Sequence, residues 1–499
     1  MRILILGLLF ISYSNLIAKD YNIEQYGAIS GGKVMCTSFI QNAINEASQN
    51  GGGRVIIPKG SFLSGTIHLK SNVSLILEKN AKLLGSLNHN DYEVIKDTDK
   101  TERYKWRALI LAEGSTNISI SGKGIINGRG DELALALDSL FYAGKLDSLE
   151  YNFIEKRPKW FIRPQLIYFY KCVNIRVSNV TLTKSACWVQ TYEKCNGIVV
   201  EGVKVESDTY WNNDGLDLID SKNVHIKNCT INSADDGICL KSESYFPNEF
   251  CDSILIENCT VRSSASAVKF GTGSLNHIRN VVVRNIKVYD TYRSAIAIEA
   301  VQGGVLENIL VENIIAKNTG NAIFMRIGRI RNVKNPGVLR NVTIRDVKVT
   351  VPFINPDYQY TIRGPELPYF HNVFPSSITG IPGHRIEDVT LENIKIIYPG
   401  RGMQAYASMP LNRIAEIPEL VTSYPEFSMF GELPAWGFYV RHADGITMKN
   451  VKIKIRKPDY RPAMVFDDVN KPYIENLKIK GDDKPNPLFF KDVNDAIIN

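Results

Sequence analysis

The amino-acid sequence predicts an all-β fold, a single-stranded right-handed parallel β-helix that is closed at its N-terminal end by a short helix. The first observation behind this prediction is a polar residue that recurs immediately before short stretches of alternating apolar residues. Successive members of the series are 22, 30, 28 and 27 residues apart, and they are Asp214, Asp236, Ser266, Ser294 and Asn321. Alternating stretches that recur at such a period are typical of a β-solenoid, in which each repeat forms one coil.

The second observation is a pair of Asn residues that brackets one strand of many coils. Asn223 is followed five residues later by Asn228, and Asn280 is followed in the same way by Asn285. Asn tolerates turn conformations, and equivalent Asn side chains of stacked strands form hydrogen-bonded ladders. The pairs therefore predict that the coils turn at the same places and lie in register.

The two ends of the solenoid are also predicted. Residues Thr37–Gln49 carry apolar side chains at helical spacing, and Gly51–Gly53 end this helix before the first strands begin at Arg54. An amphipathic helix at this place covers the open end of a solenoid, which otherwise exposes strand edges and core. The last strands are expected to finish the β-helix at about Ile479.

Three stretches interrupt the coil period, and they are expected to have functional roles. They are residues 131–159, which include a helical pattern over Leu133–Leu140, and the Pro- and aromatic-rich residues 352–382 and 398–436. Loops longer than about 15 residues in a compact fold usually carry function. The alternative is that they are padding that a solenoid tolerates.

Residues 1–18 have the features of a secretory signal peptide, namely an early Arg2 followed by an apolar run and an ending at Ala18. The run is too short to span a bilayer, and no other stretch of the sequence is long and apolar enough to do so. We therefore expect a secreted or periplasmic protein with no membrane span. Residues 19–499 are expected to form one β-helix domain, because solenoids grow without dividing into separate cores.

Charge and cysteine content exclude several functions. The formal net charge is +7, and no basic cluster interleaved with aromatic residues indicates a nucleic-acid partner. The eight cysteines include no C-x-x-C motif and the histidines number only seven, so no metal and no other cofactor is expected. Cys229 and Cys259 occupy equivalent places in successive coils, where we expect a stack of small buried side chains rather than a disulfide. We expect a monomer.

The recurring Asp residues carry the chemistry. Asp214 and Asp236 hold the same position in successive coils, so they are expected to be stacked neighbours with Asp235 beside them. The alternation directs Leu216, Leu218, Ile238 and Leu240 inward and directs a charged set outward beside these acids, namely Asp217, Lys241, Lys269, Glu299 and Arg326. Glycoside hydrolysis needs one carboxylic acid to protonate the leaving oxygen and a carboxylate to activate water. Crowding of acids raises the pKa of one of them and so keeps it protonated.

At these residues the sequence resembles the pectin-degrading glycoside hydrolases of family 28, the polygalacturonase and rhamnogalacturonase group, in a divergent bacterial branch. The family's N-T-D box reads Asn212-Asn213-Asp214, and its D-D box matches Asp235-Asp236. The resemblance covers most of the chain from Tyr26, and it implies a pectin-lyase-like β-helix. It further implies inverting hydrolysis of a galacturonate-containing pectic polysaccharide or oligosaccharide, with Asp235 as general acid and with Asp214 and Asp236 holding the water.

Two departures from the family pattern bear on specificity. The G-H-G box aligns with Ala265-Ser266-Ala267, and the R-x-K box, which grips a galacturonate carboxylate, aligns with Ala297-Ile298-Glu299. We therefore expect poor activity on plain polygalacturonan and better activity on a mixed chain of the rhamnogalacturonan type. The interruptions at 131–159 and 398–436 are expected to close one end of the groove, which favours exo cleavage. The substrate-binding candidates are Asn212, Lys241, Ser266, Lys269, Glu299 and Arg326. Lys269 has an alternative interpretation as a solvated lysine paired with Glu299.

A different class of function remains open, a noncatalytic β-helix that binds carbohydrate or serves as a surface protein. Binding alone does not need three crowded acids, which favours the enzyme. A polysaccharide lyase is less favoured, because that chemistry commonly needs Ca²⁺ and a positioned Arg or Lys base.

Overall fold

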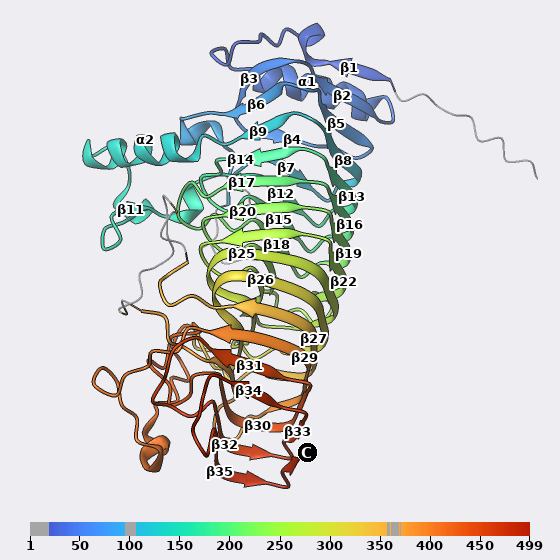
Figure 1. Ribbon diagram of the computed structural model, residues 1–499. Helices are drawn as coiled ribbons and strands as arrows, with labels where there is room; N and C mark the ends of the chain where they lie inside the picture. Colours follow the sequence, from blue (N-terminus) through green and yellow to red (C-terminus); the bar gives the residue numbers. More distant parts are fainter. Residues whose placement is uncertain (1–18, 95–105, 357–359, 361–368, 370) are drawn as a thin grey trace, which may run out of the picture.

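The computed structural model describes residues 19–94, 106–356, 360, 369 and 371–499, so the predicted signal peptide lies outside the described residues. The chain is wound into a right-handed parallel β-helix whose coils stack from the N-terminal helix α1 (Thr37–Gln49) to the C-terminus (Figure 1). The predicted fold class is confirmed, and so is the capping helix, whose bounds are those expected. The buried face of α1 carries Ile40, Ala43, Ile44 and Ala47 against the first coils.

Each coil contributes strands to three parallel faces. The face that carries the candidate site, called here the site face, comprises β4 (Ile67–His68), β7 (Ala108–Glu113), β12 (Gln165–Tyr170), β15 (Gln190–Glu193), β18 (Leu216–Ile219), β21 (Ile238–Ser242), β24 (Val268–Ser274), β28 (Ser376–Thr379), β32 (Met464–Asn470) and β35 (Leu488–Asn494), with parts of the long strands β25 (Ile278–Ala300), β26 (Val305–Ile327) and β30 (Phe438–Lys449).

The other two faces follow the same stacking. The second comprises β1 (Asp20–Asn22), β2 (Gly53–Ile57), β5 (Val73–Leu77), β8 (Thr116–Gly122), β13 (Val173–Ser178), β16 (Asn196–Glu201), β19 (Lys222–Lys227), β22 (Cys251–Glu257), β33 (Tyr473–Glu475) and β36 (Ile497–Ile498), with parts of β25, β26, β27 (Val338–Thr350), β29 (Ile386–Tyr398) and β30. The third comprises β3 (Gly60–Ser64), β6 (Ala81–Gly85), β9 (Ile125–Asn127), β14 (Thr181–Thr183), β17 (Lys204–Ser207), β20 (Thr230–Ser233), β23 (Thr260–Ser263), β31 (Lys452–Ile455) and β34 (Lys478–Lys480), with further parts of the long strands.

The period-two alternation sets which side chains fill the solenoid. Leu216 pairs with Ile238 and Leu218 with Leu240 across β18 and β21, and all four are buried in one core that runs along the axis. Burial of aliphatic side chains in successive coils stabilises each coil against its neighbours. The inward direction predicted for these residues is confirmed.

The Asn ladders form where they were expected. The Asn308 side-chain amide donates to Asn280 Oδ1 at 3.1 Å, and the amide of Asn341 donates to Asn308 Oδ1 at 2.6 Å. All three residues have left-handed backbone conformations, with φ of 54°, 55° and 51° for Asn280, Asn308 and Asn341. Asn tolerates this region better than other residues with a Cβ, because its short polar side chain finds a local partner. The ladder therefore turns each coil and holds the coils in register.

The eight cysteines are buried and unpaired, and Cys229 and Cys259 precede strands that pair in register. A stack of thiols rather than a disulfide is confirmed. One prediction about the end of the fold is wrong. The β-helix does not finish at Ile479, because β35 and β36 add strands as far as Ile498.

The first interruption forms an arm beside the solenoid. It consists of α2 (Gly130–Tyr142) followed by the antiparallel pair β10 (Tyr151–Asn152) and β11 (Arg157–Pro158) (Figure 1). Short 3₁₀ helices lie at Ile23–Tyr26, His89–Asp91, Ser148–Glu150, Trp160–Ile162 and Leu411–Glu416. Part of the 352–382 interruption lies outside the described residues. No helix among the described residues is long and apolar enough to cross a membrane.

Candidate active site

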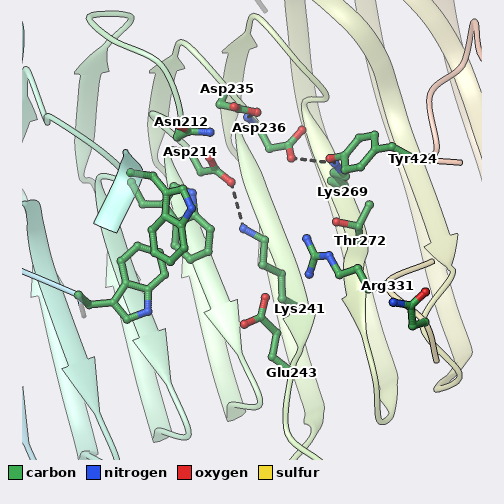
Figure 2. A pocket seen from close by; sticks show the side chains of 14 residues that line it. Asn212, Asp214, Asp235, Asp236, Lys241, Glu243, Lys269, Thr272, Arg331 and Tyr424 are labelled. Atoms are coloured by element: carbon green, nitrogen blue, oxygen red, sulfur yellow. Dashed lines mark hydrogen bonds and ion pairs between the residues drawn. The ribbon is translucent and has the colours of Figure 1, made fainter. Parts of the chain in front are cut away.

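Asp214 and Asp236 lie at the turn that leads into the site face. Each comes two residues before its strand, β18 or β21, and the Gly215 N–H donates to the Asp236 carbonyl oxygen at 2.8 Å, which stacks the two turns directly. Carboxylate oxygens of the two residues lie within 4.8 Å of one another. Asp235 sits on the same turn as Asp236 and is half-buried, whereas Asp214 and Asp236 are each 4% exposed. The structure thus brings the three predicted acids together (Figure 2).

Lys241 is the cation beside Asp214. Its Nζ lies 3.0 Å from Asp214 Oδ2, makes a still closer contact with Asp217, and lies 3.7 Å from the centroid of the Trp188 ring. The ammonium and the two carboxylates are buried, with side-chain exposures of 8%, 6% and 0% for Lys241, Asp214 and Asp217. Burial raises the pKa of Asp214 to about 7, although the Lys241 charge opposes the rise. Lys241 therefore fixes the position of the first acid.

Lys269 is the cation beside Asp236. Its Nζ lies 3.0 Å from Asp236 Oδ2 and donates to the Tyr424 hydroxyl at 3.2 Å (Figure 2). It also lies 3.8 Å from Glu299 Oε2. The Lys269 side chain is only 3% exposed. The interpretation of Lys269 as a solvated lysine is therefore wrong, although its pairing with Glu299 is present. Burial raises the pKa of Glu299 to about 8, against the opposing effect of the Lys269 charge.

A third buried cation, Arg293, acts on the acids. Arg293 pairs with Glu426 at 2.7 Å, and its charge acts on both Asp235 and Asp236. The main-chain N–H of Ser266 donates to Asp236 Oδ1 at 3.0 Å. Ser266, the residue at the family's histidine position, thus reaches the site through its backbone.

Neighbouring Asp235 and Asp236 have opposite pKa shifts. Burial, together with the charges of Asp214 and Asp236, raises the pKa of Asp235 to about 7. Burial acts in the same direction on Asp236, but the charges of Lys269 and Arg293 outweigh it, so that the pKa of Asp236 lies below its ordinary value. Two carboxyl groups with divergent pKa values are the usual basis of an acid and base pair.

The acids open into a cavity of about 590 Å³ on the site face. Its lining contains Asn212, Asp214, Asp235, Asp236, Lys241 and Lys269 from the predicted set, and Trp106, Trp160, Trp188, Glu243, Thr272, Arg331, Asn332 and Tyr424, which sequence reasoning did not single out. The Asn212 side-chain oxygen accepts from the Arg163 guanidinium at 2.7 Å, which holds it at the rim. The aromatic content of the 398–436 interruption was the available signal for Tyr424, whereas Trp160 lies just beyond the 131–159 interruption.

Three predicted binding residues, Ser266, Glu299 and Arg326, do not line the described part of the cavity. Glu299 lies behind Lys269. Arg326 is 1% exposed, and its guanidinium donates to the carbonyl oxygens of Gly380, at 2.9 Å, and Glu419. Arg326 therefore attaches the 398–436 interruption to the solenoid, because Glu419 belongs to that segment.

Asp214, Asp236 and Cys239 are close enough together to offer ligand atoms to a metal ion. Their chemistry fits one poorly, because Lys241 and Lys269 already place an ammonium group against each carboxylate. Burial also holds the pKa of the Cys239 thiol well above its usual range, which opposes the thiolate form that metals bind. The arrangement is suited to proton transfer between carboxyl groups and a bound molecule.

Comparison with known proteins gives consistent relationships. The sequence model of glycosyl hydrolases family 28 matches residues 48–352. A probable polygalacturonase of Vitis vinifera is 24% identical over 395 residues, which cover 76% of this chain and 70% of that protein. The family 28 exopolygalacturonase of Yersinia enterocolitica has a similar structure, with a TM-score of 0.68 and 18% identity over 96% of this chain and 78% of the other. The hyperthermoactive exopolygalacturonase of Thermotoga maritima gives a TM-score of 0.60 and 22% identity, covering 76% and 87% of the two chains.

Proposed function

We propose a reaction for this chain on one premise: it belongs to family 28 of the glycosyl hydrolases, whose model matches residues 48–352. The chain is therefore a glycoside hydrolase. The reaction is inverting hydrolysis of glycosidic bonds in a galacturonate-containing pectic polysaccharide or oligosaccharide. The names of the relatives, probable polygalacturonase and exopolygalacturonase, support this substrate class.

The observation that carries the mechanism is the pair of opposite pKa shifts at Asp235 and Asp236, next to Asp214. Asp235 serves as general acid, because its raised pKa keeps a proton available for the leaving oxygen near neutral pH. Asp236 serves as general base, because Lys269 and Arg293 keep it ionised. A water molecule between Asp214 and Asp236, whose carboxylate oxygens lie within 4.8 Å, is held for attack on the anomeric carbon.

Trp160 and Tyr424, which both line the cavity, suggest attack at a chain end. Trp160 directly follows the arm formed by α2, β10 and β11, and Tyr424 belongs to the 398–436 interruption. Walls at both sides of the acids favour a substrate that enters by one end, so we propose exo action. An exo enzyme releases one short product from the start of the reaction, whereas an endo enzyme first releases a range of sizes.

We further propose that residues 19–499 act as one secreted or periplasmic domain and as a monomer. The continuous core that runs from α1 to the last coils supports a single domain. The composition of residues 1–18 supports export.

The direct test is hydrolysis of a panel of pectic polysaccharides and oligosaccharides, with products identified by mass and their anomeric configuration by NMR. Asp214→Asn, Asp235→Asn and Asp236→Asn should each lower the rate by roughly 10²–10⁴ while the fold is kept. The matched control is Asp483→Asn, which changes an exposed carboxylate outside the cavity. Near wild-type turnover by Asp235→Asn would exclude it as the acid, and a retained configuration in the first product would exclude the inverting scheme.

The alternative, a noncatalytic carbohydrate-binding or surface protein, makes the opposite prediction. It would bind the same chains without cleaving them, and replacement of the acids would leave the affinity unchanged or higher. Three buried or half-buried acids with two buried ammonium groups are costly to assemble for binding alone. This observation favours catalysis.

A further inference from the structure

Three tryptophans form a patch on one side of the acids. The Trp106 ring centroid lies 4.4 Å from that of Trp160 and 4.6 Å from that of Trp188. Trp188 is one coil towards the N-terminus from Asp214, because the Val189 N–H donates to the Asp214 carbonyl oxygen at 2.8 Å. Trp106 precedes β7, which lies further in the same direction. The patch therefore occupies the N-terminal end of the cavity.

The tryptophan patch is separate from the solenoid core. It belongs to a small apolar cluster on the outer side of the site face, which also contains Ala108, Leu111, Tyr168, Tyr170 and Cys187. Trp160 and Trp188 are only partly buried and line the cavity. Trp106 is 4% exposed, yet its Nε1–H finds no acceptor among the described residues. An indole N–H that is buried without a partner is costly, and a bound oxygen atom would remove that cost.

Carboxylates outnumber cations beside Trp188. Lys241 is the cation next to Trp188, and it is shared by Asp214 and Asp217, while Glu243 also lines the cavity. A carboxylate on a bound sugar would be repelled here. The C-terminal side differs, because the exposed Arg331 lines the cavity there and forms no ion pair with any described residue (Figure 2). Lys269 does not distinguish the two sides, because it is shared by Asp236 and Glu299.

We propose that Trp106, Trp160 and Trp188 form a subsite for an uncharged sugar ring, and that the uronate unit lies on the opposite side of the acids, towards Arg331. The inference rests on the proposed function and specifies its substrate. The apolar C–H face of a sugar packs on the exposed indole rings, and one of its oxygens accepts from Trp106 Nε1–H. A deoxyhexose such as rhamnose and a methyl-esterified uronate both have the required chemistry.

Binding is measured with the Asp235→Asn protein, so that the ligand is not consumed, by calorimetry and by tryptophan fluorescence. The three probes are oligosaccharides of equal length: oligogalacturonate, its fully methyl-esterified form, and an alternating chain of rhamnose and galacturonate. The inference expects one or both of the last two to bind more tightly than oligogalacturonate. Which of them does so identifies the source of the uncharged ring.

Trp160→Ala tests the patch without removing a contact to the catalytic acids, and Trp188→Ala is the second variant. Each should weaken binding of the preferred chain by roughly tenfold and change binding of oligogalacturonate by no more than about twofold. Arg331→Ala should weaken binding of the two chains that carry free carboxylates, oligogalacturonate and the alternating chain, and should change binding of the fully methyl-esterified chain little. The matched control is Phe153→Ala, which removes an aromatic ring that is 76% exposed on the arm. Thermal unfolding of each variant verifies that it is folded.

Equal binding of all three chains, or an equal loss for all of them in Trp160→Ala, would overturn the inference. Hydrolysis of the same chains by the unmodified protein separates this failure from failure of the proposed function. If the chains are cleaved but all three bind equally well, the subsite is overturned and the proposed function stands. If no chain is cleaved, the proposed function fails and the subsite fails with it.

Discussion

Replacement of Lys269 by Met gives the sharpest test of how the site is held together. Met has nearly the same shape as Lys without its charge, so packing is kept. The change removes the ammonium group that lies 3.0 Å from Asp236 and 3.8 Å from Glu299 and leaves two buried carboxyl groups without it. Two cations that act on Asp236 remain: Arg293, which is already paired with Glu426, and Lys241, which is shared by Asp214 and Asp217.

The expected cost follows from the burial of this cluster. Removing one partner of a buried ion pair costs about 3–5 kcal/mol, because the other charge stays buried without compensation. The loss should depend on pH in a defined direction. Without Lys269 the pKa values of Asp236 and Glu299 rise, so the folded state binds protons that the unfolded state has released. The loss of stability in Lys269→Met is therefore smallest at acidic pH and grows as the pH rises. It continues to grow towards and past about pH 8, which is the pKa of Glu299 when Lys269 is present.

Urea unfolding at acidic and at alkaline pH measures this difference. The matched control is Lys204→Met, which breaks an exposed pair with Glu206 at 2.6 Å and should cost no more than about 1 kcal/mol. The rate should change as well, because Asp236 then ionises only at higher pH. The acidic limb of the kcat/KM profile should therefore move to higher pH. A Lys269→Met protein as stable as the unmodified protein at alkaline pH would refute the reasoning.

The remaining predictions concern the acid and the ladder. The kcat/KM profile should fall as the pH rises through about 7, where Asp235 loses its proton, and a profile that stays flat to about pH 9 would contradict its role as the acid. Glu426→Gln removes a negative charge near Asp235 and takes away the carboxylate that pairs with Arg293, so the pKa of Asp235 should fall. The alkaline limb of the kcat/KM profile should then move to lower pH, and a shift to higher pH would contradict the charge arrangement. Asn308→Ala should lower the free energy of unfolding by about 2 kcal/mol, because the variant loses two ladder hydrogen bonds and keeps a left-handed backbone, whereas Asn308→Gly should lose less. Urea unfolding of both variants checks this, and equal losses would contradict the backbone part of the argument.

The sequence was sufficient for the coil register and for the acid cluster. Both depend on patterns that recur from coil to coil, so the alternation after Asp214 and Asp236 places these acids on adjacent turns without knowledge of distant contacts. The same argument placed Lys269 beside them. It did not show that Lys269 is buried, since its covering residue Tyr424 lies in an aperiodic segment 155 residues later in the chain.

The misplaced and missed residues have a common physical cause. Alternation tells whether a side chain points outward, but it does not tell what covers that side chain. Arg326 points outward as expected, yet interruptions fold over it, and its guanidinium donates to the carbonyl oxygens of Glu419 in the 398–436 interruption and of Gly380 in the 352–382 interruption. Trp106 and Trp188 precede their strands at positions without a repeat signal, so their meeting with Trp160 could not be read from the sequence. The last coils were missed because a polar, proline-containing stretch precedes β35.

The unpaired cysteines make the stability of the solenoid measurable coil by coil. They lie at different heights along the axis, from Cys36 next to α1 to Cys251 and Cys259 beyond the acids. A buried thiol reacts with a labelling reagent only when its surroundings open, so each labelling rate reports a local opening free energy. Opening that begins at the C-terminal coils would detach the segment carrying Tyr424 and Glu426 while every thiol stays protected. Activity would then be lost well before the bulk of the β-structure.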